Sequence, residues 1–185
     1  VLLAVCGTAM QGVFRNPLAD PSLIGVSSGA SAGASFMIVL GGGALLQSGQ
    51  FAGLSAIALG AFAGGFLAVL LVYRLATSSS GTSVATMLLA GIAISALAGA
   101  LNSLFSFVAD DEMLRRISLW QMGSLDAANW PRVWIAALVT GVLLWVLPRD
   151  ASALNAFLLG ESEARHLGIA VTAVKRRVIL LTAMA

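Results

Sequence analysis

Residues 15–30 of this chain read RNPLADPSLIGVSSGA, which places a charged turn with two prolines between two apolar segments. Pro17 and Pro21 each lack a backbone N–H and push the preceding residue out of the helical region, so a helix that arrives from Val1 must end here. Asp20 can then cap a new helix that has Pro21 at its first position. The stretch therefore predicts two helices joined by a turn.

Glycine recurs every fourth residue after this turn. Gly25, Gly29 and Gly33 would line one face of the new helix with hydrogen atoms, so that a neighbouring helix can approach closely inside lipid. Residues 25–29 also match the Gly-x-Ser-x-Gly nucleophile elbow, but that motif needs a strand before it and a base nearby. Here the context is helical and the single histidine, His166, lies in another segment. We interpret the glycines as a packing stripe.

The composition predicts a membrane protein. Hydrophobic residues make up 59% of the chain and charged residues 10%, and the mean hydropathy is +0.97. No charged residue occurs between Pro21 and Tyr73 or between Leu75 and Ala109. A helical crossing takes about 20 residues, and long apolar runs without alternation satisfy their backbone in lipid as helices. We expect an all-α, polytopic transmembrane bundle.

Apolar segments are expected at 1–14, 24–40, 51–73, 83–109, 130–147 and from 178 to the end. The first and the last are too short to cross a bilayer, which leaves four full spans. The chain also lacks an initiator Met and begins and ends within apolar runs. We therefore expect one transmembrane domain over 1–185, truncated at both ends.

Basic residues in alternate loops predict the orientation. If the turn at Arg15 faces the cytoplasm, that side collects seven of them: Arg15, Arg74, Arg149, Arg165, Lys175, Arg176 and Arg177. The opposite side has three: Arg115, Arg116 and Arg132. The loop 110–130 would then face the periplasm. The pI of about 9.3 thus reflects membrane topology, and no nucleic-acid partner is expected.

Several kinds of chemistry are not expected of this chain. Lys175 is the single lysine and no Gly-x-x-x-x-Gly-Lys precedes it, so a phosphate-binding loop for ATP would have to be on another subunit. Cys6 and His166 are each the single residue of their type and lie in separate segments. This argues against a zinc site or a Cys-His nucleophile, and no catalytic residue and no metal site are expected.

A second informative stretch, at 150–168, reads DASALNAFLLGESEARHLG. Asp150 can cap a short helix that ends at Gly160, and residues 161–167 can form another that ends at Gly168. The first helix has an apolar stripe at i, i+3 and i+4, formed by Leu154, Phe157 and Leu158. Both helices are too short to span. The pattern alone is typical of an interfacial pair lying against lipid headgroups.

The span at 83–109 is the best candidate for lining a pathway. Gly91, Ser95 and Gly99 form a small-residue face, and polar groups follow toward one end, namely Asn102, Ser103 and Ser106. Polar residues in spans face a bundle interior or water, which fits a pore. Hydrogen bonding between helices explains the same residues equally well.

The stretch at 15–30 resembles the signature of the FecCD family of iron-chelate and cobalamin permeases, the membrane subunits of bacterial type II ABC importers. The pattern Leu159-Gly160-Glu161, Ala164-Arg165 and Leu167-Gly168 is similar to that family's cytoplasmic coupling helices. The segment 119–125 with Trp130 resembles a third family segment. The resemblance covers nearly the whole chain, with the three matches in order.

The resemblance implies part of a ten-span permease in the bacterial inner membrane that imports an iron chelate, either a ferric siderophore or haem. A cobalamin permease is the alternative. The implied partners are a second permease copy, two ATP-binding cassette subunits and a periplasmic or lipid-anchored binding protein. ATP and Mg would be bound by the partner ATPase, and this chain would bind no cofactor and would not be an enzyme itself.

The resemblance also assigns roles to residues. ATPase coupling falls to the loop 148–176, through Leu154, Leu159, Gly160, Glu161, Ala164, Arg165, Leu167 and Gly168. The cytoplasmic gate comprises Asn16, Pro17, Leu18, Ser80 and Thr82, and the pathway comprises Gly91, Ser95, Gly99, Asn102 and Ser106. Arg115 and Arg116 could meet the binding protein, although tryptophans at 120 and 130 also fit simple interfacial anchoring.

Two other classes of membrane protein are alternatives to an ABC permease. An ATP-independent secondary transporter usually has ionisable residues within its spans, and the predicted spans have no charged residue apart from Arg132 at the start of 130–147. A purely structural membrane scaffold would explain the packing glycines but not the pattern at 159–168. Both remain weaker interpretations than an ABC permease.

Overall fold

The computed structural model describes residues 1–47, 50–78, 81–123 and 128–184. Over these residues the chain is helical apart from one short antiparallel hairpin, β1 (Thr77–Ser78) and β2 (Gly81–Thr82). The helices are α1 (Leu2–Phe14), η1 (Pro21–Ile24), α2 (Val26–Gln47), α3 (Gln50–Ala76), α4 (Val84–Val108), α5 (Asp111–Met122), α6 (Trp130–Val146), η2 (Leu147–Asp150), α7 (Ala151–Leu159), α8 (Glu161–His166) and α9 (Val171–Ala183).

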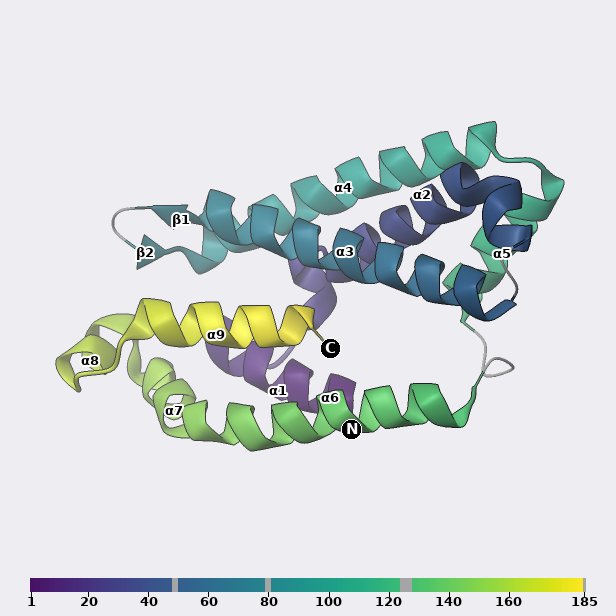
Figure 1. Ribbon diagram of the computed structural model, residues 1–185. Coiled ribbons are helices and arrows are strands. Elements are labelled where there is room, and N and C mark those ends of the chain that lie inside the picture. Colours follow the sequence, from purple (N-terminus) through teal and green to yellow (C-terminus); the bar gives the residue numbers. More distant parts are fainter. Residues whose placement is uncertain (48–49, 79–80, 124–127, 185) are drawn as a thin grey trace.

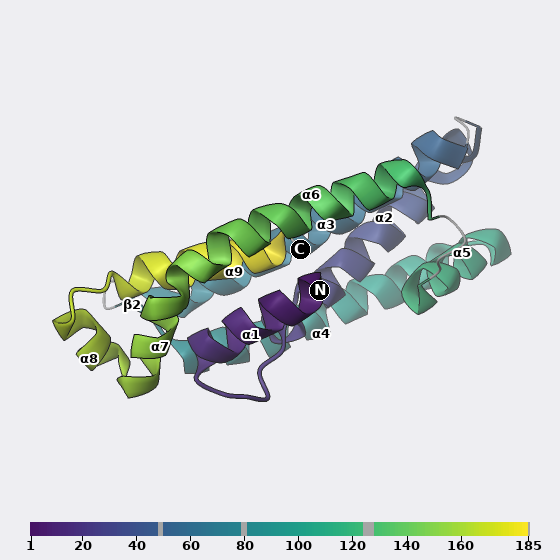
Figure 2. The same cartoon turned by 90° about the horizontal axis from the view of Figure 1, so that it is seen from below.

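The bundle is elongated, and its two ends differ (Figure 1). One end, here called the hairpin end, consists of β1, β2, α7 and α8, whereas α5 lies at the opposite, α5 end. Helix α1 ends in the half of the bundle that contains the hairpin, and helix α9 starts there. Both helices reach only to the middle of the bundle (Figure 2). The predicted coupling loop and the predicted periplasmic segment are therefore at opposite ends.

Three helical stretches of the described residues are long and apolar enough to cross a membrane: Ser55–Ala76, Val84–Val108 and Trp130–Leu159. The apolar stretches Leu2–Phe14 and Val26–Gly41 are shorter. Large apolar side chains remain exposed along the long helices, for example Leu89, Leu138 and Trp145 at 69% each. Lipid is the solvent in which such exposure is stable. The chain is thus a bundle of transmembrane helices, as its composition predicts.

Helices α2 and α3 pack through facing glycines. A Cβ added to Gly29 would lie 2.5 Å from the carbonyl oxygen of Gly64, and one added to Gly33 would collide with the carbonyl oxygen of Gly60. The packing stripe is confirmed for these two glycines. It is wrong for Gly25, which precedes α2 and has a left-handed φ of 76°.

The turn before α2 follows the prediction only in part. Asp20 accepts a hydrogen bond from the Ser22 N–H at 2.8 Å, and Pro21 is the first residue after this cap. The capped element is one turn of 3-10 helix, after which Gly25 redirects the chain and α2 begins at Val26. Hydrogen bonds from the hydroxyl and the N–H of Ser22 lower the pKa of Asp20.

Two charged segments that were expected to be loops are helical. Asp110 accepts a hydrogen bond from the Met113 N–H at 2.8 Å and caps α5, inside the predicted loop 110–130. Helix α9 begins at Val171, seven residues before the predicted start at 178. Its buried side follows helical spacing through Val171, Val174, Lys175, Val178, Ile179 and Thr182. The charges at 175–177 are therefore inside the helix.

Candidate functional site

Helices α7 and α8 form a bent pair at the hairpin end. Helix α6 continues through η2 into α7, and Phe157 of α7 lies in the hydrophobic core with Leu154 packed against that core. A Cβ added to Gly12 of α1 would lie 3.3 Å from Leu154, so the two helices are in close contact there. Gly160 ends α7 with φ 118° and ψ 150°, a conformation that favours glycine. The chain then turns directly into α8.

The predicted cap of α7 by Asp150 is wrong. The Asp150 side chain makes no capping bond, and instead its Oδ1 lies 3.0 Å from Nη1 of Arg177 on α9. Its other oxygen has no hydrogen-bond partner among the described residues. A buried carboxylate gains more from a guanidinium than from a weak helix cap, which explains the difference. The pair fastens the start of α7 to α9.

The predicted coupling residues divide into an exposed and an inward-facing group. Leu159 and Leu167 are 70% and 65% exposed, and Arg165 and Gly168 are exposed beside them. We call these four residues, together with Leu158, the coupling edge; three of the five are exposed leucines, and Glu163 and His166 are exposed on the same helix pair. In contrast, Ala164 is fully buried, and Leu154, Gly160 and Glu161 are partly buried. The inward group positions the pair, and the exposed group is available to a partner.

Glu161 is bonded to Lys175 of α9. The Lys175 Nζ lies 2.6 Å from Glu161 Oε1 and 2.9 Å from the carbonyl oxygen of Thr82, and the lysine side chain is 1% exposed. Glu161 Oε2 lies 3.8 Å from Arg165. Buried charges persist when they are paired and hydrogen-bonded, as here. No sequence motif indicated this junction, because its members come from three separate segments.

The predicted gate residues lie in two places. Asn16 stabilises its own turn, since its Oδ1 accepts a hydrogen bond from the Leu18 N–H at 2.9 Å, and Leu18 is 85% exposed. Pro17 lies between them. Thr82 is buried in the hairpin, where its hydroxyl is 2.9 Å from that of Thr77. Ser80 lies outside the described residues.

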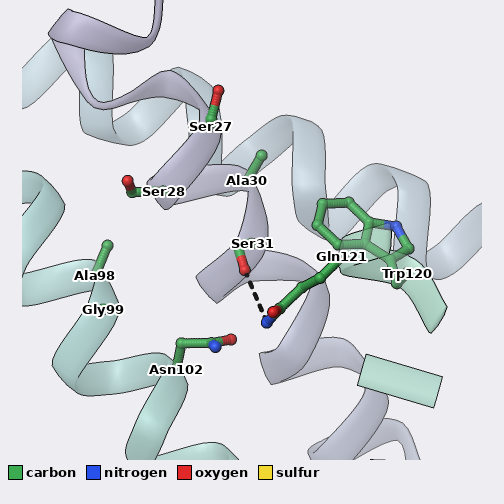
Figure 3. Close-up of a pocket in the computed structure, with 9 residues that line it drawn as sticks. All are labelled: Ser27, Ser28, Ala30, Ser31, Ala98, Gly99, Asn102, Trp120 and Gln121. Atoms are coloured by element: carbon green, nitrogen blue, oxygen red, sulfur yellow. Dashed lines mark hydrogen bonds between the residues drawn. The ribbon is translucent and has the colours of Figure 1, made fainter. Parts of the chain in front are cut away.

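An open pocket of about 590 Å³ lies between α2, α4 and α5; its lining is mixed, and it is here called the polar cavity after its hydroxyl and amide groups (Figure 3). Gln121 of α5 donates a hydrogen bond to the hydroxyl of Ser31 of α2 at 3.4 Å across it. The cavity is lined by Ser27, Ser28, Ala30, Ser31, Ala98, Gly99, Asn102, Trp120 and Gln121. Hydroxyl and amide groups dominate its polar wall, and none of these residues is ionisable.

Two of the five predicted pathway residues, Gly99 and Asn102, line this cavity. Gly91 is buried against the carbonyl group of Leu23, and Ser95 lies near Gly25. The Ser106 hydroxyl donates to the Asn102 carbonyl of its own helix at 3.0 Å. These three residues are not among those that line this cavity, and their role in a pathway stays a prediction.

Sequence reasoning missed the cavity walls from α2 and α5. Ser31 lies one helical turn after Ser27 and Ser28 on α2, a spacing that could have indicated a polar face beside the glycines. Trp120 and Gln121 fall in the predicted loop 110–130, where the sequence predicts no helix. Residues 124–125 of the family-like segment 119–125 lie outside the described residues.

Arg115 and Arg116 both belong to α5. Arg116 forms an ion pair of 2.9 Å with Glu112 one turn earlier, and Arg115 is exposed at the α5 end. Over the described residues there is no group of three or more His, Cys, Asp or Glu side chains that could hold a metal ion. The described residues thus contain two candidate functional features, the coupling edge at the hairpin end and the polar cavity toward the α5 end.

Known proteins with similar sequences and structures were compared with the chain. A sequence profile of the FecCD transport family matches residues 1–185. The hemin transport system permease protein HmuU of Yersinia pestis is 40% identical over 184 residues, which are 98% of this chain and 53% of that protein. The cobalamin import system permease protein BtuC of Halobacterium salinarum is 38% identical over 186 residues, which are 98% and 47%.

A solved structure is also similar. It is assigned to the metal-chelate type of ABC transporter in an inward-facing conformation, and it matches with a TM-score of 0.84 and 30% sequence identity. The match covers 99% of this chain and 56% of that one. The chain spans about half the length of the curated relatives it matches.

Proposed function

The chain belongs to the FecCD transport family, and on that premise we propose that it forms part of the permease subunit of an ABC importer for a metal chelate. The importer lies in the cytoplasmic membrane, with the hairpin end inside the cell and the α5 end outside. ATP and Mg are bound by partner subunits, whose hydrolysis of ATP drives import. A second copy of the permease completes the pathway.

The coupling edge is the observation that carries this proposal. Leu159 and Leu167 are exposed at the end of the bundle, Leu159 as the last residue of the apolar stretch Trp130–Leu159, and charged residues follow on α8. An exposed apolar patch rimmed by polar groups is typical of a protein interaction site. At the same time α7 and α8 are fixed to the bundle through Leu154, Ala164 and Glu161. A partner that pushes on this edge would therefore move the bundle.

Haem is the first candidate for the substrate. It is supported by the relative named as a hemin permease, which is 40% identical over 98% of this chain. Cobalamin is the second candidate, supported by the relative named as a cobalamin permease at 38% identity. Ferric siderophores, which are iron chelates as haem is, are a third candidate. The cavity of α2, α4 and α5 supplies neutral polar groups that would let a bulky chelate pass without strong retention.

We expect transport by alternating access, because the two ends of the bundle meet different partners. A binding protein delivers the chelate at the α5 end, where Arg115 and Arg116 lie. The ATPase subunits close and displace α7 and α8 at the hairpin end, and the route opens inward. No bond in the chelate is made or broken, which agrees with the neutral lining of the cavity.

Reconstitution tests the proposal. The full gene product would be purified with its ATPase and placed in liposomes with the binding protein, and uptake of haem, cobalamin and a ferric hydroxamate would be measured with and without ATP. The double variant Leu159→Glu, Leu167→Glu should lose the ATPase during purification. Leu119→Glu, at the α5 end and 51% exposed, is the matched control and should retain it.

Uptake of a chelate that requires ATP, together with loss of the ATPase from the coupling-edge variant alone, would support the proposal. Uptake that continues without ATP or an ATPase subunit would instead favour a secondary transporter. Retention of the ATPase by the double variant would contradict the docking role of the coupling edge.

A further inference from the structure

Lys175 joins three segments that are distant in the sequence. It lies on α9, and its Nζ contacts Glu161 of α8, 14 residues away, and the carbonyl oxygen of Thr82, 93 residues away. The side chain is 1% exposed. Lysine is rarely buried to this degree unless its charge is paired. The function proposed above makes no use of this contact.

The Thr82 carbonyl belongs to a stiff element. Thr77 pairs with Thr82 in the β1–β2 register, their hydroxyls are 2.9 Å apart, and the Ser83 N–H donates to the Ala76 carbonyl at 3.0 Å. The hairpin directly joins the end of α3 to the start of α4, where Ser83 caps the helix. Any force on the Thr82 carbonyl therefore acts on the ends of α3 and α4 together.

Arg165 of α8 and Thr172 of α9 also lie near this hairpin. A Cβ placed on Gly81 would lie 3.9 Å from Nη2 of Arg165 and 3.9 Å from the Thr172 hydroxyl. Asp150 and Arg177, 3.0 Å apart, fasten the start of α7 to the same helix α9. Both members of the bent pair are thus bonded to α9, but it is Lys175 that extends the connection to the hairpin.

A buried ammonium makes this connection hard to stretch. Lysine has three donors, of which two are used by Glu161 and Thr82. Moving α8 away from the hairpin would leave the Lys175 ammonium, which is 1% exposed, without one of its partners in a dry environment, which is costly. The two segments are therefore favoured to move together.

We infer that Lys175 is a positioning residue that transmits displacement of α8 to the β1–β2 hairpin, and through it to α3 and α4. The inference rests on the proposed function, since the displacement comes from the ATPase. Helix α4 carries Gly99 and Asn102 of the polar cavity. Lys175 thus connects the coupling edge with a wall of the cavity.

The test compares Lys175→Met, Lys175→Arg and the matched control Arg176→Met in the reconstituted complex. Arg176 is the adjacent, exposed cation of α9, so its variant removes the same charge without removing the junction. Two quantities are measured: chelate taken up per ATP hydrolysed, and amide hydrogen exchange in peptides covering 77–83 and 161–167. Haem is the probe.

We expect Lys175→Met to keep ATP hydrolysis and to lower uptake per ATP roughly ten-fold, the usual size of a coupling between sites. Exchange should become faster in both peptides. Lys175→Arg should restore part of the uptake per ATP hydrolysed, and Arg176→Met should have the uptake per ATP of the wild type. If uptake and hydrolysis fall together in Lys175→Met with an unchanged ratio, Lys175 is a folding residue and the inference is overturned.

A double variant covers the case in which Lys175→Met does not fold. Lys175→Met with Glu161→Met replaces both charges by apolar groups, a change that proteins often tolerate in stability. It should fold and still transport poorly per ATP; normal transport per ATP would overturn the inference. A wild-type complex that imports no chelate with ATP would instead refute the proposed function, which makes the two failures distinguishable.

Discussion

The Ser35 hydroxyl of α2 donates a hydrogen bond to Oδ1 of Asn102 on α4, with 2.5 Å between the two oxygens. Ser35 is 1% exposed, so water does not replace this bond. The bond crosses between two helices beside the polar cavity, and the same asparagine lines that cavity. It therefore sets how far apart two walls of the cavity lie.

Ser35→Ala should destabilise the protein by about 1 kcal/mol, because polar bonds between membrane helices are worth roughly 0.6 to 2 kcal/mol. Unfolding in mixed micelles with increasing dodecyl sulfate would measure the change. Ser106→Ala removes a hydroxyl that bonds to its own helix and should cost less. Equal effects of the two substitutions would show that the bond between α2 and α4 contributes nothing specific.

Gly33→Ala should separate α2 from α3. The new methyl group would collide with the Gly60 carbonyl, and overpacking of this kind costs about 1–3 kcal/mol. Gly141→Ala is the control, because no atom lies within 4 Å of its added Cβ. The same unfolding assay applies. A variant Gly33→Ala as stable as Gly141→Ala would contradict the close packing of α2 and α3.

Gly99→Leu should block transport without unfolding the protein. No atom lies within 4 Å of a Cβ added at Gly99, so a leucine side chain has room at the wall of the cavity. We expect uptake of the chelate to fall about ten-fold or more while the ATPase still co-purifies, since a filled route changes passage and not assembly. Gly141→Leu, on α6, should leave uptake unchanged. Normal uptake by Gly99→Leu would exclude the cavity from the route.

The carboxyl group of Asp20 should titrate below the ordinary pKa of aspartate. The Ser22 hydroxyl and then the Ser22 N–H stabilise its charged form, which lowers the pKa in the folded protein. The Asp20 carboxylate therefore stabilises the folded protein at pH values above the ordinary aspartate pKa. This contribution to folding is lost as the pH falls through the lowered pKa of the folded state. Carbon-13 NMR of labelled aspartate can follow this titration. Ser22→Ala should move the pKa part of the way back, and an unchanged pKa would refute the contribution of the hydroxyl.

The arrangement of helices could be predicted from the sequence where one interaction dominates. Apolar runs place the long helices, prolines and Gly160 end them, and Gly29 and Gly33 indicate the side on which α3 packs. These features depend on burial in lipid and on backbone geometry, both of which are local in sequence. The stretch at 150–168 also predicted the two short helices with boundaries within one or two residues.

Features that depend on distant partners could not be predicted in the same way. Lys175 was assigned to a loop because a charge normally ends an apolar run, and its acceptors on Glu161 and Thr82 are 14 and 93 residues away. Helix α5 was also missed, although Asp110 has the spacing of a helix cap. Its charge suggested a loop, while its role as a cavity wall depends on contact with α2. Local patterns thus predict elements better than the junctions between them.

Gly160 has a consequence for how transporters of this kind can diversify. Its φ of 118° and ψ of 150° set the bend between α7 and α8 in the main chain. The side chains of Leu159 and Leu167 are exposed and lie outside the buried contacts that position the two helices. Under the proposed function, mutations of these leucines can therefore adapt the surface to a different ATPase while the orientation of the two helices is inherited unchanged.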